Sequence, residues 1–536
     1  MKVPSRGVLA ADPLIGAGNV LLRLLQLGAD PDGPGLTFDT AVDHYPAEQP
    51  LTLGQLDERV AVRAAALHAR GIRPRDPVAI WSATAADHIL SFLAANRLGA
   101  IPALVNGNLP AVTAAAYIRN LRARAAFADA DRLAQLQGCD LGEAVLAGVA
   151  ELGDADPADA PAPYRHHRDD PIVLTHTSGT TGMPKAVLHT HATLFAATRH
   201  LLSMPQAQGT RRILNALPAA HTATVLMVNQ ALANRADFLA LSSQQGSQVL
   251  AAIERWRPES VFGFSVTWAE LARLDLTGYD LDCVRLWFNT GDCTHEPHVR
   301  HLVAVGSHDE MTRQGVVRRA GSNFIDGLGS SEMGHSMFHI THRTDTDSYD
   351  RCIGQPYRFV EATVLDDDGE PVADGVVGHL GISSPSLSPG YWNDSLTTHR
   401  ARRNGYYLTG DLVRRDAEGR FYHLDRAADS ITGPDGTRYY TALAEERIQA
   451  ACPQVLDCTV VIRRIGDEVV SEVLLDVDPD QASAAADQLA EQVRAALDPA
   501  TAATVRRVAV TPAAQVPRGA TGKVRKAVLR EQEPVR

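Results

Sequence analysis

Apolar side chains recur at helical spacing in the first hundred residues of the chain. Within residues 53–70, Leu56, Val60 and Leu67 lie four and seven positions apart, and this period predicts an amphipathic helix. Gly71 follows, and glycine is common just beyond the C-terminus of a helix. Short apolar runs on either side of a second helical pattern predict buried strands. The elements expected here are a helix over 53–70, a strand over 78–81, a helix over 85–98 and a strand over 100–105.

This alternation of helices and strands continues to about residue 300. It predicts a layered α/β fold with largely parallel strands. From Glu361 short strands and turns predict a small β-rich subdomain that ends near Leu424, and a separate α+β unit follows. We therefore expect a large N-terminal domain over 1–424, a hinge over 425–429 and a small C-terminal domain over 430–536. Further expected elements are strands over 172–176, 324–328, 459–463 and 469–476 and helices over 442–451 and 482–497.

The composition is that of a large globular protein. Of 536 residues, 45% are hydrophobic and 21% are charged, which is ordinary for folded domains. A net charge of −12 argues against a nucleic-acid-binding surface and against binding to acidic membranes. The six cysteines form no CxxC pair, which is typical of free thiols in a reducing compartment. We expect a cytoplasmic enzyme with no membrane span and no nucleic-acid partner.

Residues 174–185 form the most informative motif, L-T-H-T-S-G-T-T-G-M-P-K. Glycine lets backbone N–H groups approach a ligand, hydroxyl side chains add donors, and Lys185 supplies a compact positive charge. Together they predict a polyphosphate-binding loop, although it is not a Walker loop, because the lysine follows the second glycine by three residues. The alternative is an ordinary turn between two strands. The candidate ligand residues are Thr177, Ser178, Gly179, Thr180, Thr181, Gly182 and Lys185.

Three further motifs follow along the chain. Residues 326–333 read D-G-L-G-S-S-E-M, where a missing third glycine argues against a dinucleotide-binding fold, and a helix cap is the alternative. Residues 407–411 read Y-L-T-G-D, and Arg426 lies fifteen positions after that aspartate, so a carboxylate and a guanidinium could clamp two ribose hydroxyls. Residues 517–526, P-R-G-A-T-G-K-V-R-K, present Lys523 on a glycine-containing loop that alone would be a charged tail.

In order and spacing, these four motifs resemble those of the AMP-forming acyl- and aryl-acid adenylating enzymes. That superfamily includes acyl-CoA synthetases, peptide-synthetase adenylation domains and luciferases, and the resemblance covers the whole chain. It implies that the protein binds ATP and Mg²⁺, and that a small-molecule carboxylic acid attacks the α-phosphorus to form an acyl-adenylate and pyrophosphate. It also implies a mobile C-terminal domain that then rotates to admit CoA or a carrier-protein thiol.

The resemblance also implies roles for single residues. The loop at 177–185 holds the β- and γ-phosphates, Ser331 bonds the α-phosphate, and Glu332 holds Mg²⁺, an ion that prefers oxygen ligands. Lys523 contacts the α-phosphate and the acid. The catalytic set would be Lys523, Glu332, Thr177 and Lys185. Adenine and ribose would meet Gly291, Asp292, Asp326 (at the adenine amino group), Gly327, Leu328 (in place of a usual tyrosine), Gly329, Asp411 and Arg426.

The expected acid is small and aromatic. The run D-G-L-G-S-S-E-M-G-H is especially similar to aryl-CoA ligases related to benzoate–CoA ligase. His221 matches the position that floors the acid pocket of this family. The expected pocket residues are His221, Phe264, Trp268, Gly329, Met333 and His335. Residues 295–298, H-E-P-H, lack the spacing of a zinc motif. The oligomeric state is left open, a homodimer included.

The hinge departs from the family pattern. The family sequence G-R-x-D-D-x-I-K reads D-R-A-A-D-S-I-T over 425–432, and Thr441 replaces a usual proline. The main expectation is an acid–thiol ligase that passes the acyl group to CoA or another acceptor. Because only the thiolation side has changed, a carrier protein, an amine, or nitrite used to diazotise an aryl amine stay open as acceptors. A non-catalytic binding protein is disfavoured by the presence of Lys523, Glu332 and Asp411. We expect a C-terminal domain less firmly locked in the thioester-forming orientation.

Overall fold

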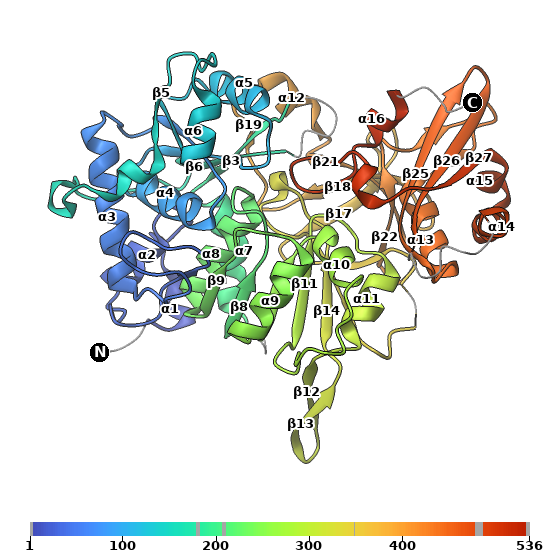
Figure 1. The fold of residues 1–536 in the computed structure, drawn as a ribbon, viewed down its shortest axis with the longest axis horizontal. Helices are drawn as coiled ribbons and strands as arrows, with labels where there is room; N and C mark the ends of the chain where they lie inside the picture. Colours follow the sequence, from blue (N-terminus) through green and yellow to red (C-terminus); the bar gives the residue numbers. More distant parts are fainter. Residues whose placement is uncertain (1–3, 178–182, 206–210, 348, 478–485, 532–536) are drawn as a thin grey trace.

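The chain folds into a large domain and a small one. The computed structural model describes residues 4–177, 183–205, 211–347, 349–477 and 486–531. In Figure 1 the large domain fills the left and centre, and the last part of the chain, orange to red, forms the small domain at the right. The predicted fold, a large α/β domain followed by a small α+β domain, is confirmed.

A seven-stranded sheet in the described chain flanks the glycine-rich loop. Its order is β19-β7-β6-β3-β2-β4-β5. The strands from β6 to β5 are parallel, and β7 returns antiparallel to β6, so that the loop at 177–185 joins the ends of these two strands. The strands are β2 (Pro77–Ser82), β3 (Ile101–Asn106), β4 (Ala125–Ala128), β5 (Val145–Gly148), β6 (Pro171–His176), β7 (Ala186–Thr190) and β19 (Gly390–Tyr391).

A 13-stranded sheet, also counted over the described residues, carries the other motifs of the large domain. Its parallel half comprises β1 (Thr37–Phe38), β9 (Asp237–Ala240), β8 (Arg212–Asn215), β10 (Ser260–Gly263), β11 (Leu286–Thr290) and β14 (Asn323–Gly327). Its antiparallel half comprises β15 (Phe338–His342), β16 (Cys352–Pro356), β22 (Phe421–Arg426), β21 (Tyr406–Arg415), β18 (Gly378–Ser383) and β17 (Glu361–Leu365), with β20 (Arg402–Arg403) beside β21. The strands of the expected β-rich subdomain therefore do not form a separate sheet; they continue the parallel one.

The helices of the large domain pack on these sheets. The helix predicted over 53–70 is α3 (Leu53–Ala69), which begins with a capping box between Thr52 and Gln55. The helix predicted over 85–98 is α4 (Ala85–Leu98). The others are α1 (Arg6–Ala11), α2 (Val20–Gln26), α5 (Ala111–Leu121), α6 (Ala130–Leu136), α7 (Thr193–Ser203), α8 (Thr222–Asn234), α9 (Gly246–Trp256), α10 (Ser265–Leu271), α11 (Glu296–Val303) and α12 (Ser395–Arg400).

The small domain has its own hydrophobic core. Its buried residues include Ile448, Val460, Val473 and Val493, which are less than 2% exposed. The part of the expected helix over 482–485 lies outside the described residues. The elements are β23 (Ile431–Thr432), β24 (Arg438–Tyr439), β25 (Val455–Ile465), β26 (Glu468–Val477), β27 (Val505–Val510), α13 (Thr441–Ala451), α14 (Ala486–Ala496), α15 (Pro499–Thr504) and α16 (Lys526–Glu531).

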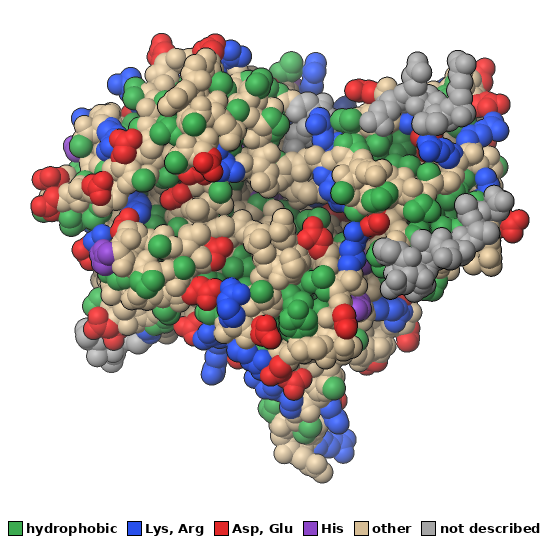
Figure 2. Space-filling model, in the orientation of Figure 1, with side chains coloured by type: hydrophobic (Ala, Val, Ile, Leu, Met, Phe, Trp, Pro, Cys, Tyr) green, Lys and Arg blue, Asp and Glu red, His purple; other side chains and the backbone are tan. Residues whose placement is uncertain are grey.

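One hairpin projects from the large domain, β12 (Ser307–Thr312) with β13 (Gly315–Ala320). It extends downward in Figures 1 and 2, and charged side chains lie along it. Arg318 and Arg319 pair with carboxylates of the facing strand at 2.6 and 2.7 Å. None of the helices described in the structure is long and apolar enough to cross a membrane.

Candidate active site

The base of the glycine-rich loop is closed by two hydrogen bonds. The Thr177 N–H donates to the Lys185 carbonyl, and the Lys185 N–H donates to Thr177 Oγ1, both at 3.1 Å. Lys185 Nζ lies 5.4 Å from the ring centroid of Tyr391, on β19. The other predicted ligands of this loop, Ser178, Gly179, Thr180, Thr181 and Gly182, lie outside the described residues.

Glu332 lies on a short 3₁₀ turn, η3 (Ser331–Met333). The Tyr391 hydroxyl donates to Glu332 Oε1 at 2.9 Å, and His189 Nε2 donates to the Ser331 carbonyl at 2.7 Å. Burial lowers the pKa of His189 to about 4, so this imidazole is neutral near pH 7. Two neighbouring strands therefore fix the Glu332 turn. Its carboxylate has the oxygen chemistry that fits Mg²⁺.

His221 caps the N-terminus of α8 and contacts the same turn. Its Nδ1 accepts a hydrogen bond from the Ala223 N–H at 3.1 Å, so the neutral ring carries its proton on Nε2 and donates to Ser331 Oγ at 3.2 Å. Burial, with the nearby charge of Lys523, lowers the pKa of His221 to about 3. The ring meets Phe264 edge-on, with centroids 5.0 Å apart. Because Ser331 accepts this bond, its own hydroxyl hydrogen can be donated to a ligand.

Asp326 holds the loop that follows β11. The Asn289 side-chain amide donates to Asp326 Oδ1 at 2.6 Å, and the Thr294 N–H donates to Oδ2 at 3.0 Å. Burial raises the pKa of Asp326 to about 6. Both oxygens therefore position residues 289–294, and the contact with adenine expected from the sequence stays a prediction. Gly291 is required there, because a Cβ would lie 3.3 Å from the Phe264 ring and its φ is 96°.

The strand register brings the predicted ribose clamp together. Asp411 on β21 is paired with Arg426 on β22, and Arg426 Nη1 donates to Asp411 Oδ1 at 3.0 Å. His423 Nε2 also contacts this oxygen, at 3.1 Å. Burial alone would raise the pKa of Asp411, but Arg426 and His423 outweigh it and lower the pKa to about 2. The carboxylate is therefore ionised across the physiological pH range.

Lys523 reaches this site from the small domain. Its Nζ lies 3.6 Å from Asp292 Oδ2, and its charge lowers the pKa of Asp292 against the opposing effect of burial. The neighbouring Gly522 packs on α10, where a Cβ would lie 3.1 Å from Val266. The structure thus brings together residues separated by more than 200 positions, as the sequence motifs predict.

Several expected pocket residues lie in the core. Trp268 is 0% exposed; its indole N–H donates to Asn289 Oδ1 at 2.9 Å and its ring packs edge-on against Trp287 and Phe324. The expectation that Trp268 lines the pocket is therefore wrong, because the ring lies under the sheet and supports Asn289 from behind. Phe264, Met333 and His335 of the predicted pocket are also buried, as is Leu328 of the predicted adenine site, while Gly327 and Gly329 pack against the Ser336 segment.

The interface between the two domains uses residues that the motifs do not include. Glu446 on α13 accepts hydrogen bonds from His295 Nδ1 at 2.6 Å and from the Glu296 N–H at 3.0 Å. Arg273 pairs with Asp476 on β26 at 2.7 Å. Of these segments only 295–298 stands out in the sequence, as a histidine-containing run without the spacing of a zinc motif. These contacts hold the small domain in the orientation that places Lys523 in the site.

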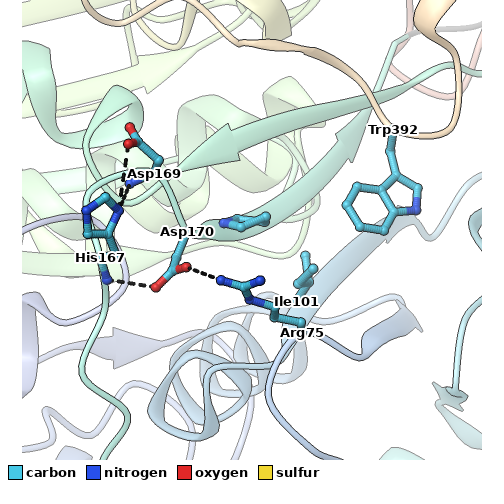
Figure 3. A pocket seen from close by; sticks show the side chains of 7 residues that line it. Arg75, Ile101, His167, Asp169, Asp170 and Trp392 are labelled. Carbon is cyan, nitrogen blue, oxygen red and sulfur yellow. Dashed lines mark hydrogen bonds and ion pairs between the residues drawn. The ribbon is translucent and has the colours of Figure 1, made fainter.

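A separate cavity of about 380 Å³ lies away from these residues. Figure 3 shows that Asp170 points to Arg75 and that His167 lies beside Asp169. Its walls come largely from the amino ends of β3 and β6, whereas the glycine-rich loop follows the carboxyl end of β6. Its charged groups are paired with one another, and it includes none of the predicted site residues that the structure describes.

The comparisons with known proteins agree with this geometry. The family model described as "AMP-binding enzyme" matches residues 36–392. The chain is 44% identical to 3-aminoavenalumate diazotase from Streptomyces sp, with 98% of this chain and 97% of the relative covered. It is 26% identical to 3-amino-2-hydroxy-4-methoxybenzoate diazotase from Streptomyces cremeus, with 89% and 88% covered.

The fold agrees with a solved structure as well. O-succinylbenzoate coenzyme A synthetase from Bacillus subtilis, in complex with ATP and magnesium ion, superimposes with a TM-score of 0.78 at 20% identity, with 96% of this chain and 99% of that chain covered. The family model spans well over half of the chain. The chain belongs to the AMP-binding enzymes and has the fold of the adenylate-forming members.

Proposed function

We propose that this protein is an ATP-dependent diazotase, which uses nitrite to convert the amino group of a small aminoaryl acid into a diazonium group. The observation that carries the proposal is 44% identity over nearly the whole chain to a diazotase, supported by a second diazotase at 26%. The altered hinge, where the thiolation side departs from the CoA-ligase pattern, points the same way. This replaces CoA with nitrite and an amine as the reaction partners of the adenylating site.

The chemistry follows from the likeness of nitrite to a carboxylate, since both present an anionic oxygen. A nitrite oxygen attacks the α-phosphorus of ATP, the bond to the β-phosphate bridging oxygen breaks, and pyrophosphate leaves. The product is a mixed anhydride of nitrite and AMP. The amine nitrogen then attacks the nitroso nitrogen, the N–O bond to AMP breaks, and the amine loses a proton. The resulting N-nitrosamine rearranges to a diazohydroxide, takes up a proton and loses water to give the diazonium ion.

The described side chains suit the first of these steps. Lys523 and the Ser331 hydroxyl would neutralise charge that develops on the α-phosphate, a contribution that depends on donors fixed in advance. Asp411 and Arg426 would hold the ribose. Glu332 would hold Mg²⁺, which when bound neutralises phosphate charge.

The aromatic acid would lie near His221. Phe264 offers an aromatic wall there, and the neutral imidazole adds no positive charge. The amine must be unprotonated to attack the nitroso nitrogen, and aryl amines are weak bases that meet this condition near pH 7.

The test is a pyrophosphate-release assay with ATP and a panel of aminoaryl acids, each matched to the same acid without its amino group. Release is expected to require nitrite, and the amine-bearing acids should yield a diazonium ion that couples with a naphthol to a coloured azo compound. Lys523→Ala should lower both signals by about 10²–10³. The exposed Arg319→Gln, on the projecting hairpin, is the matched control and should change neither.

The contrary outcome is equally clear. Acid-dependent pyrophosphate release without nitrite, followed by formation of a thioester when CoA is added, would identify a CoA ligase and refute the diazotase proposal. The membership of the chain in the AMP-binding family would stand in either case.

A further inference from the structure

Arg351 is a buried guanidinium beside the ribose clamp that no sequence motif identifies. Its side chain is 2% exposed, and it begins the segment that leads into β16. Its φ is 53° and that of Asp350 is 37°, a left-handed conformation that side-chain-bearing residues rarely adopt. Such backbone persists where surrounding contacts hold it, and it concentrates at functional sites. The contacts of Arg351 therefore need an explanation.

The guanidinium fixes the orientation and the tautomer of His423. Arg351 Nε donates to the His423 carbonyl at 2.9 Å, and Arg351 Nη2 donates to His423 Nδ1 at 2.9 Å. Arginine has donors only, so Nδ1 must be the acceptor and the ring must carry its proton on Nε2. That proton points to Asp411 Oδ1, at 3.1 Å. Arg351 thus determines which atom of His423 donates to the clamp carboxylate.

The two terminal nitrogens of the guanidinium also lie near carboxylates of both domains. Arg351 Nη2 lies 3.9 Å from Asp292 Oδ1, and Nη1 lies 3.9 Å from Glu446 Oε2 on α13 of the small domain. Asp292 is the partner of Lys523. The buried positive charge is therefore balanced by groups that are in place when the small domain is docked in this orientation.

We propose that Arg351 is a positioning residue for the nucleotide: through His423 it orients the Asp411 carboxylate toward the ribose hydroxyls. The proposal rests on the ribose role of Asp411 given under the proposed function. Stability alone is a poor reason for the arrangement, because buried charge networks can often be replaced by apolar residues without loss. A chain of donors that ends on a ligand-facing carboxylate matches the way outer residues orient the groups that touch a ligand.

The experiment compares the dissociation constants of ATP and 2′,3′-dideoxy-ATP, measured by calorimetry, so that it does not depend on nitrite chemistry. We expect the wild-type protein to prefer ATP by at least about tenfold, the size of a lost hydrogen bond to a charged group. Arg351→Gln and His423→Phe should weaken ATP about tenfold and leave 2′,3′-dideoxy-ATP nearly unchanged. His423→Gln keeps an amide donor for Asp411 and should retain most of the preference.

A double variant, a control variant and a second single variant complete the test. In an Asp411→Ala background, Arg351→Gln should cause no further loss of preference, because both changes act through one carboxylate. Arg420→Gln, an exposed arginine of the same hairpin that pairs with Asp416 at 2.8 Å, is the matched control and should behave as wild type. If Arg351→Gln fails to fold, His423→Phe decides alone, since it leaves the arginine in place.

The outcomes that overturn the proposal are distinct. Equal weakening of both nucleotides by Arg351→Gln or His423→Phe would show a purely structural role. An effect additive with Asp411→Ala would show that Arg351 does not act through that carboxylate. If Asp411→Ala itself left the preference for ATP unchanged, the ribose clamp would be misassigned and the proposal would fail with it.

Discussion

Replacing Asp425 with glycine should loosen the contact between the two domains. Asp425 lies near the end of β22, at the start of the expected hinge, and Thr441 begins α13 beyond it; they are 1% and 0% exposed. The Asp425 carboxylate accepts hydrogen bonds from the Thr441 N–H and from Thr441 Oγ1, the latter at 2.9 Å. Lys526 Nζ donates to the same hydroxyl at 2.7 Å, so the hydroxyl hydrogen points at the carboxylate. These bonds form a clamp across the hinge between Asp425 and Thr441.

The magnitude follows from the two bonds. A hydrogen bond to a charged group contributes about 1.5–3 kcal/mol, and taking the lower value for each gives about 3 kcal/mol for the clamp. Since about 1.4 kcal/mol is a factor of ten, Asp425→Gly should raise the undocked fraction about a hundredfold. Thr441→Val removes only the hydroxyl and should raise it about tenfold.

Hydrogen exchange measures this opening directly. Amides of residues 427–432 should lose protection by about the factors given above, because exchange from a folded protein reports the free energy of the local opening. Peptides from the core of the large domain, such as α4, should exchange as in wild type, and Arg319→Gln serves as the control for handling. Unchanged protection of residues 427–432 in Asp425→Gly would refute the idea that this clamp holds the domains.

Three further outcomes are expected. Lys523→Ala should lower the rate of pyrophosphate release by about 10²–10³ while ATP still binds, because a positioned donor acts mainly in the transition state; wild-type rates would remove Lys523 from the chemistry. Asp411→Ala should raise the KM for ATP about tenfold with a smaller change in kcat, and an unchanged KM would argue against the ribose role. Glu446→Gln should flatten the acid limb of a plot of unfolding free energy against pH. Burial alone would raise the pKa of Glu446, but His295 and Arg351 lower it below the usual range for a glutamate. The ionised Glu446 therefore stabilises the folded state above that range, and this stabilisation is lost as the pH falls through the lowered pKa. An acid limb in Glu446→Gln identical to that of the wild type would contradict this.

Helices and strands were predicted well where several local sequence signals agreed. The helix predicted over 85–98 from its apolar pattern coincides with α4, where the structure adds a side-chain cap from Thr84 and a C-terminal Gly99. The β-rich segment after Glu361 was predicted as strands, and those strands exist. That these strands extend the parallel sheet was not predicted. Pairing between two strands depends on which strand edges meet in space, and the pairing of β14 with β15 has no signal in the local sequence.

Only the candidate site residues that lie within sequence motifs could be predicted. Asp411, Arg426 and Lys523 could be proposed from sequence because each lies in a short run of characteristic residues, and their roles stay predictions. His423 and Arg351 were missed, since a histidine in a strand and an arginine in a turn carry no sequence signal until strand register places them side by side. Trp268 was expected in the pocket because of its position in the sequence. In the structure helix α10 directs its ring into the core, which the sequence alone did not indicate.

The hinge shows why departures from a pattern must be interpreted in pairs. Taken one at a time, the aspartate at 425 and the threonine at 441 look like the loss of a glycine and a proline. Together they make a contact that neither family residue could form, because glycine has no acceptor side chain and proline has no N–H to donate. We expect this contact to stabilise the orientation in which Lys523 lies 3.6 Å from Asp292. A CoA ligase would be hindered by it, because its second step requires the small domain to rotate. In the proposed diazotisation, nitrite and the amine are small enough to share the site, so the anhydride can meet its nucleophile without that rotation.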